Sequence, residues 1–233
     1  IPTGFSPAAE AEAEAAKPPQ LKGREDLRDM PLITIDPADA RDHDDAVYAH
    51  PDADNEGGWV VWAAIADVAA YVRPGSALDR EARDKGNSVY FPDRVEPMLP
   101  ETLSNGLCSL KEGENRACLA VRMVFNAQGR KTSHRFVRGL MRSAAKLSYE
   151  EAQAAHDGQP GEKAGPIMDA VMTPLWSAYA VMKKGRDQRS PLAIESAERR
   201  IVFNEEGQIA SIAPREALEA HKLIEEIMVQ ANV

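Results

Sequence analysis

The residues of this chain whose types and spacing could do chemistry are five aspartates crowded within residues 36–45. They are Asp36, Asp39, Asp42, Asp44 and Asp45. Strand-like apolar runs flank them at 32–35 and 46–49, and the proline between these runs favours a loop. Like charges this close repel one another, so a bound cation would offset the repulsion. Oxygen ligands suit a hard divalent ion, Mg²⁺ before Ca²⁺ or Mn²⁺.

The register excludes a calcium-binding EF-hand. A calcium loop that starts at Asp42 places Ala46 at a ligand position and Val47 where the glycine belongs. The same register puts Ala53 where the closing glutamate belongs. A solvated acidic loop is the usual meaning of such a charge run. The spacing alone therefore leaves metal chemistry and a solvated loop both open.

A family resemblance favours metal binding over a solvated acidic loop. The pattern Asp36-x5-Asp42-x-Asp44-Asp45 after a hydrophobic strand resembles the signature of the RNB catalytic domain of the ribonuclease II/ribonuclease R family, and is most similar to the bacterial ribonuclease R branch. Further blocks resemble the family in the same order, over roughly residues 21–233. These blocks are Ala64–Val68, Tyr71–Asp79, Ser88–Pro92, Pro97–Pro100, Leu103–Leu110 and Ala220–Val233.

The resemblance implies an activity and assigns residues to it. It implies processive 3′→5′ hydrolysis of single-stranded RNA to nucleoside monophosphates, dependent on Mg²⁺, with Mn²⁺ as the possible substitute. Carried over by position, Asp36, Asp42, Asp44 and Asp45 are the catalytic, metal-holding aspartates. We expect Asp36 and Asp45 to be direct ligands, and loss of Asp44 to harm chemistry more than RNA binding. Asp39 matches no family aspartate and is interpreted as a surface residue.

The resemblance also predicts three RNA-binding residues. Tyr90 matches a tyrosine that packs against the 3′-terminal nucleotide, and such stacking tolerates any base. Glu225 matches a glutamate that contacts the same nucleotide. Ile194 stands where the family usually offers an aromatic ring, so strong stacking is not expected there. Without the family, Tyr90 would be a strand tyrosine and Glu225 an exposed helix charge. His43, where the family often has Phe or Met, is interpreted as a spacer.

The chain is predicted to be a fragment. Residues 1–20 are expected to form a linker or N-terminal extension, with a loosely held helix over 8–16. Residues 21–233 are expected to be the N-terminal part of the RNB domain, truncated at its C-terminus, because an uncapped helix is still running at Val233. The resemblance implies that OB-type RNA-binding domains flank the whole domain and that a later arginine assists the reaction. We therefore expect the fragment to be weak or inactive alone. The alternative is a catalytically incomplete RNA- or protein-binding module.

Composition sets further limits. With 233 residues, 43% of them hydrophobic, the chain can bury a sizeable core, and it has no apolar run long enough for a membrane span. Two cysteines outside CxxC spacing predict a reducing cytoplasm rather than a disulfide framework. The net charge of −9 argues against nucleic-acid binding, yet residues 111–146 are locally basic. Either a basic channel wall or an ordinary solvated face explains that segment.

The elements that must position the aspartates predict an α+β fold. Strands are expected near 59–65, 88–91, 117–125 and 133–143, in a twisted mixed or antiparallel sheet. Helices are expected from Ser76, from Ser148, over 167–186 with a kink at Pro174, and from 216 to the end. The three later helices are predicted to pack on the sheet, with the acidic loop in a cleft at one end of it.

Overall fold

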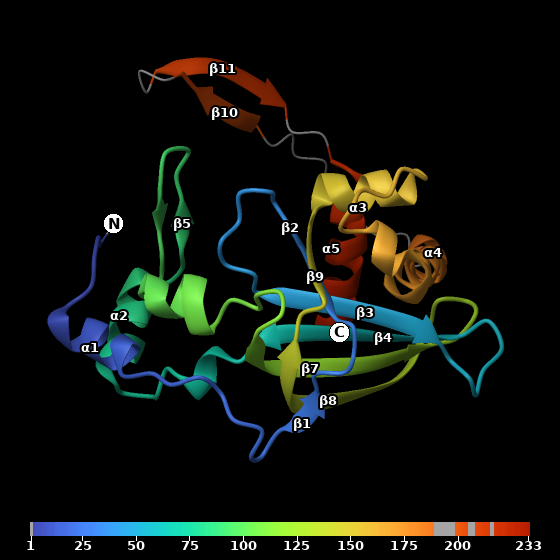
Figure 1. Ribbon diagram of the computed structural model, residues 1–233, viewed down its shortest axis with the longest axis horizontal. Helices are drawn as coiled ribbons and strands as arrows, with labels where there is room; N and C mark the ends of the chain where they lie inside the picture. Colours follow the sequence, from blue (N-terminus) through green and yellow to red (C-terminus); the bar gives the residue numbers. More distant parts are fainter. Residues whose placement is uncertain (1, 189–198, 205–207, 215–216) are drawn as a thin grey trace.

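A seven-stranded mixed sheet organises the computed structural model, which describes residues 2–188, 199–204, 208–214 and 217–233 (Figure 1). Across the sheet the strands are β1 (Glu25–Leu27), β8 (Lys131–Arg142), β7 (Asn115–Phe125), β4 (Trp59–Ala66), β3 (Asp45–Pro51), β2 (Ile33–Asp36) and β9 (Ala145–Ser148). The two outermost pairs, β1–β8 and β2–β9, are parallel, and the pairs between them are antiparallel. The α+β class and the mixed sheet are confirmed.

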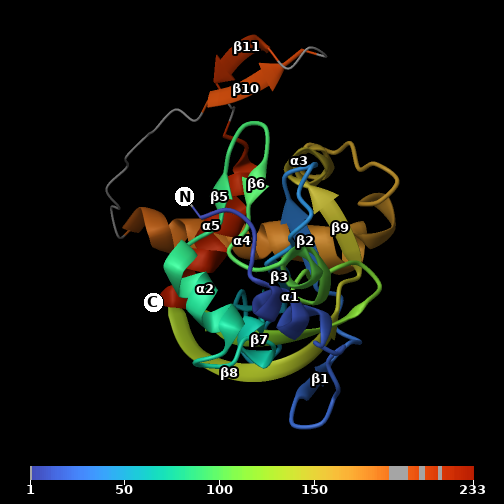
Figure 2. The same cartoon turned by 90° about the vertical axis from the view of Figure 1, so that its left-hand side faces the viewer.

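Helices and two small hairpins surround this sheet. The helices are α1 (Pro7–Glu14), α2 (Ala77–Lys85), α3 (Tyr149–His156), α4 (Thr173–Gln188) and α5 (Glu219–Asn232), with the short turns η1 (Val68–Ala70), η2 (Leu103–Leu107), η3 (Gly165–Ile167) and η4 (Met168–Met172). The hairpins are β5 (Val89–Tyr90) with β6 (Val95–Glu96), and β10 (Arg199–Phe203) with β11 (Ile209–Pro214). Figures 1 and 2 show both hairpins projecting toward the top of the view, beyond the sheet. None of the described helices is long and apolar enough to cross a membrane.

The central strands are apolar on both faces, because the sheet separates two hydrophobic clusters. Along β4, Val61 and Ala63 join the cluster under α3, α4 and α5, whereas Val60 and Trp62 join the cluster on the opposite face. Side chains alternate between faces along a strand, so a strand buried on both faces is a nearly continuous apolar run. The run 59–66 therefore becomes the rigid centre of the domain.

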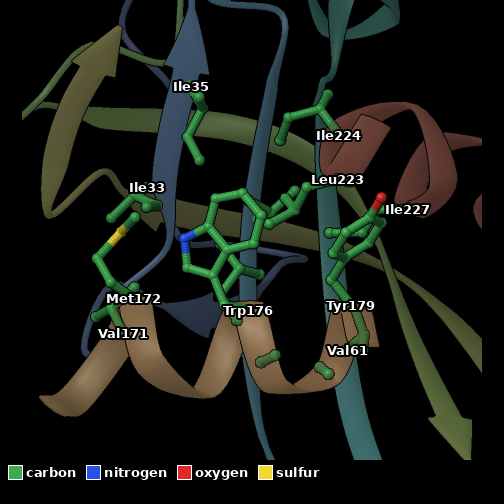
Figure 3. Packing of buried hydrophobic residues seen from close by; sticks show 14 of the residues in the cluster. Ile33, Ile35, Val61, Val171, Met172, Trp176, Tyr179, Leu223, Ile224 and Ile227 are labelled. Atoms are coloured by element: carbon green, nitrogen blue, oxygen red, sulfur yellow. The ribbon is translucent and has the colours of Figure 1, made fainter. Parts of the chain in front are cut away.

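The three later helices cover one face of the sheet, as predicted. Figure 3 shows Trp176 of α4 among Ile33 and Ile35 of β2 and Leu223 of α5. The indole also stacks on the His156 ring of α3, with the ring centroids 4.0 Å apart. One aromatic side chain thus joins two helices and the strand that carries the first aspartate.

The predicted long helix changes type just before Pro174. Residues 168–172 form the π-helical turn η4, which runs directly into α4 at Thr173, so Pro174 lies in the first turn of the α-helical part. The 3-10 turn η3 precedes both. The apolar side chains Val171, Leu175 and Met182 of this segment are buried.

The N-terminal helix is packed, not loosely held. Ala9 and Ala13 of α1 are buried in the cluster that also contains Leu78 of α2. The Glu12 carboxylate accepts hydrogen bonds from the backbone N–H groups of Ala77 and Leu78, at 3.0 and 3.1 Å. These are the unpaired donors at the start of α2, so the N-terminal helix caps a helix of the domain.

The β7–β8 turn lies against α4 with a glycine on each side. Gly129, at a φ of +77°, has no room for a Cβ beside the backbone oxygen of Val181. Gly185 of α4 has none beside the backbone of Gly129. This close backbone approach fixes the helix on the longest hairpin of the sheet.

Replacing Gly129 by alanine should therefore destabilise the fold through both conformation and contact. We expect a loss of about 2–5 kcal/mol in the free energy of unfolding, measured by urea denaturation. Gly86→Ala is the matched control, because Gly86 has a φ of +79° and no atom within 4 Å of an added Cβ. It should lose only about 1–2 kcal/mol. Equal losses in the two variants would contradict the close contact.

Candidate active site

The acidic loop joins two adjacent strands of the sheet. Asp36 ends β2, where it pairs with Ser148 of β9, and Asp45 opens β3, where it pairs with Ile65 of β4. Asp42 and Asp44 lie between the strands, on the loop. The predicted strand–loop–strand arrangement around the aspartates is therefore confirmed.

Distant segments hold this loop in place through hydrogen bonds. Lys146 of β9 donates from Nζ to the carbonyl oxygen of Ala40 at 3.0 Å. The Ser109 hydroxyl accepts from the backbone N–H of His43 and donates to the carbonyl oxygen of Arg41, both at 3.0 Å. The backbone N–H of Leu110 donates to the carbonyl oxygen of His43 at 2.8 Å. The loop is thus fixed at its middle as well as at its ends.

The first aspartate is bonded to a histidine within the loop. His43 Nδ1 lies 2.8 Å from Asp36 Oδ2, and both residues are buried, with exposed fractions of 3% and 9%. His43 is therefore not a spacer, as the sequence was interpreted, but a polar partner of a candidate ligand. Sequence reasoning missed this role, and it missed Ser109 as the residue that fixes the loop.

The last aspartate carries an oxygen without a partner. Among the described residues, none forms a hydrogen bond with the buried Oδ2 of Asp45. Burial, followed by the negative charges of Asp36 and Asp44, raises the pKa of Asp45 from its ordinary 3.8 to about 7. A buried, unpaired carboxylate oxygen is costly unless a proton or a cation satisfies it.

The other two aspartates lie on the open side of the loop. Partial burial and the charges of Asp42 and Asp36 raise the pKa of Asp44. Asp42 accepts a hydrogen bond at Oδ2 from the Tyr90 hydroxyl, at 2.7 Å. Figure 1 shows the β2–β3 loop rising beside the hairpin that carries Tyr90. The tyrosine is 63% exposed, so its ring is accessible next to the aspartates.

The donor set fits a hard divalent cation by its chemistry. It offers carboxylate oxygens, a raised pKa at two aspartates and one buried oxygen without a partner. Within the described parts of the chain, however, no group of three or more His, Cys, Asp or Glu side chains is placed so that it could hold an ion as it stands. Two of the four carboxylates are hydrogen-bonded to Tyr90 and His43.

The remaining predicted site residues are placed differently. Glu225 lies exposed on α5, with its carboxylate 3.5 Å from the Arg186 guanidinium of α4, so the described contacts do not join it to the aspartates. Ile194 lies outside the described residues. Asp39 is exposed on the loop, in keeping with its interpretation as a surface residue.

Many of the basic residues between 111 and 146 have structural partners. Arg116 donates to the carbonyl oxygen of Ser109, Arg135 pairs with Glu25, and Lys131 donates to carbonyl oxygens at the end of α5. These bonds weaken the channel-wall interpretation for those residues. A hollow of about 780 Å³ lies between residues 12–24 and 70–76, and none of the four aspartates lines it. The described geometry therefore does not confirm the predicted cleft at the acidic loop.

Comparison with known proteins finds similar sequences and structures. Residues 24–233 match the family model described as RNB domain. The chain is 46% identical to the ribonuclease R of Vibrio parahaemolyticus, over 91% of this chain and 25% of that protein. It is also 46% identical to the ribonuclease R of Escherichia coli, over 91% of this chain and 26% of that protein.

A solved structure agrees with these sequence matches. Mycoplasma genitalium RNase R, in complex with ribose-methylated single-stranded RNA, superposes with a TM-score of 0.92 at 28% identity. The match covers all of this chain and 36% of the other. The chain thus spans about a quarter of the length of the two curated relatives.

The raised pKa of Asp45 predicts a stability effect with a definite sign. A carboxyl group with a higher pKa in the folded state stabilises the fold at low pH, and this contribution is lost as the pH rises through about 7. In EDTA, Asp45→Asn should therefore be more stable than the wild type at pH 8, by at most about 4 kcal/mol. The gain should shrink to less than half at pH 5.

Urea denaturation at the two pH values measures this difference, and Asp39→Asn is the control for loss of an exposed loop aspartate. Adding Mg²⁺ at pH 8 should stabilise the wild type more than Asp45→Asn, because the cation replaces the proton. A gain that is larger at pH 5 than at pH 8 would contradict the burial of this charge.

Proposed function

Because the chain belongs to the RNB domain family, we propose that it is the N-terminal part of the catalytic domain of a Mg²⁺-dependent 3′→5′ exoribonuclease. The proposed reaction is the processive hydrolysis of single-stranded RNA to nucleoside monophosphates. The observation that carries the proposal is the loop that presents Asp36, Asp42, Asp44 and Asp45 between β2 and β3, with a buried oxygen of Asp45 unpaired.

The aspartates supply fixed negative charge, not proton transfer. Asp36 and Asp45 are proposed as direct ligands, since both are held at strand ends. Asp36 is buried, and half-buried Asp45 has one buried oxygen without a partner among the described residues. Asp42 and Asp44 lie on the solvent side of the loop and are proposed to complete the set of metal-holding carboxylates on the side where RNA would bind. Divalent ions, when bound to such carboxylates, activate water and stabilise the developing charge on the leaving oxygen. Mn²⁺ is the proposed substitute for Mg²⁺.

Tyr90 is proposed to receive the 3′-terminal nucleotide. Its ring is exposed, and its hydroxyl is bonded to Asp42, so a stacked nucleotide would lie next to the acidic loop. Stacking on an aromatic ring needs no particular base, which suits a general RNA-degrading enzyme. Glu225 and Ile194 remain proposals that rest on the family resemblance alone.

We also propose that the chain is weak or inactive by itself. It spans about a quarter of its curated relatives, and the arginine that the resemblance places on a later segment would be needed at the reacting phosphate. Loss of one such electrostatic group costs on the order of 10²–10³ in rate. The proposed partners of the whole protein are single-stranded RNA and flanking OB-type RNA-binding domains, and its proposed location is the cytoplasm.

Asp44→Asn should strongly reduce the rate of RNA shortening with little effect on folding, because it removes one of several charges that repel one another. A 5′-labelled single-stranded oligoribonucleotide is incubated with a chain extended to the length of the relatives, in Mg²⁺ or in EDTA. We expect shortening from the 3′ end that requires Mg²⁺ and falls by on the order of 10²–10³ in the variant. The rate of the 233-residue chain, compared with that of the extended chain, then measures how much of the catalytic activity this part retains.

Asp39→Asn is the matched control in this assay, since Asp39 lies exposed on the same loop outside the motif. It should retain the wild-type rate. If the extended chain is folded and binds RNA but leaves it intact in Mg²⁺, the exonuclease proposal fails and the binding-module interpretation takes its place. Equal losses in Asp39→Asn and Asp44→Asn would also count against the assigned roles.

Tyr90 offers a separate prediction on binding. Tyr90→Ala should weaken binding of a single-stranded oligoribonucleotide by about 1–3 kcal/mol, the value of one stacked base. Tyr90→Phe keeps the ring and loses only the bond to Asp42, so it should bind within threefold of the wild type. Fluorescence anisotropy in EDTA measures this binding without cleavage. A phenylalanine variant as weak as the alanine variant would contradict a stacking role.

A further inference from the structure

The loop contains one polar pair that the proposed reaction does not use. His43 and Asp36 are seven positions apart in sequence, and their side chains meet at 2.8 Å in the protein interior. A buried carboxylate needs a hydrogen-bond partner, and here the partner is a residue of the same loop at a position interpreted from sequence as a spacer.

The direction of the hydrogen bond follows from the groups. An ionised carboxylate can only accept, so His43 Nδ1 carries the hydrogen and donates to Asp36 Oδ2. The backbone of His43 is held on both sides, because its N–H donates to Ser109 Oγ and its carbonyl oxygen accepts from Leu110. The ring is thus a fixed donor whose position is set from the segment 109–110, not from the loop.

The forces on Asp36 explain what such a donor does. Asp36, Asp44 and Asp45 lie on one short loop between β2 and β3, so their like charges repel one another. Without a partner, the carboxylate of Asp36 would rotate away from its neighbours. A buried hydrogen bond to one oxygen opposes that rotation and sets the orientation of the whole carboxylate.

We propose that His43 is a positioning residue that orients the Asp36 carboxylate for a divalent cation shared with Asp45. The proposal rests on the proposed function, because that function brings the cation to these aspartates. Partners that orient metal ligands typically contribute 10–100-fold in metal affinity. A phenylalanine at this position would fill the space and leave Asp36 free to turn.

Binding of Mn²⁺ to the chain tests this inference directly. Free Mn²⁺ is measured by electron paramagnetic resonance at pH 8. His43→Phe should raise the Mn²⁺ dissociation constant by about 10–100-fold. His43→Asn should restore binding to within about threefold of the wild type, because its amide nitrogen takes the place of Nδ1. His50→Phe, on β3 with its ring bonded to the Pro51 carbonyl oxygen, is the control and should bind as the wild type does.

Comparing His43→Asn with one further variant, His43→Gln, keeps the test decisive if His43→Phe does not fold. His43→Gln carries the same amide one methylene further from the backbone, so it cannot donate from the position of Nδ1. Tight binding by His43→Asn and weak binding by His43→Gln supports the proposal. Equal binding by these two variants, wild-type binding by His43→Phe, or no Mn²⁺ binding by the wild-type chain overturns it.

The RNA assay separates this inference from the proposed function. In the extended chain, His43→Phe should need a 10–100-fold higher Mg²⁺ concentration for half-maximal rate, with a rate near the wild type at saturating Mg²⁺. If Mn²⁺ binding depends on His43 while RNA stays intact, the inference stands and the exonuclease proposal fails. If RNA is shortened and neither metal affinity nor the Mg²⁺ requirement depends on His43, the proposal for His43 fails alone.

Discussion

Mutual repulsion among four carboxylates is the constraint on which the rest of this structure depends. Asp36, Asp42, Asp44 and Asp45 lie on one loop between adjacent strands, where burial, followed by the charge of neighbouring aspartates, raises the pKa of Asp44 and Asp45. An unfolded chain would let these charges separate, so the fold must supply the free energy that keeps them together. The sheet and the bonds around the loop supply it.

The supports of the loop come from all sides and differ in kind. β2 and β3 hold its ends, and two hydrophobic clusters bury the strands on both faces. Ser109, Leu110 and Lys146 hold its middle through hydrogen bonds to the loop backbone. His43 and Tyr90 hold individual carboxylates. Backbone and side chains are thus fixed separately, which lets the loop keep its shape while the carboxylates stay available to a ligand.

The sequence was a good guide wherever the signal was local. Alternating and continuous apolar runs placed β4, β7 and β8, and the caps at Ser76 and Ser148 placed α2 and α3. Pro174 indicated where the long helix is irregular, but the sequence did not predict that the irregularity is a π-helical turn before the proline. The four aspartates could be found from spacing and resemblance. The bond between His43 and Asp36 could not, because it depends on a contact with residues 109–110 that only the folded chain creates.

The parallel pairing of β2 with β9 has a consequence for how the chain acquires its site. Lys146, beside that pairing, is bonded to Ala40 across 106 positions of sequence, so the loop takes its final form only when remote parts of the chain have met. Such long-range closure is slow compared with the formation of helices or hairpins. During synthesis, the aspartates emerge early as an unsupported acidic segment and gain their arrangement only after β9 has left the ribosome. The proposed metal site therefore cannot take shape before β9, whose Lys146 lies 106 positions beyond Ala40, has been made.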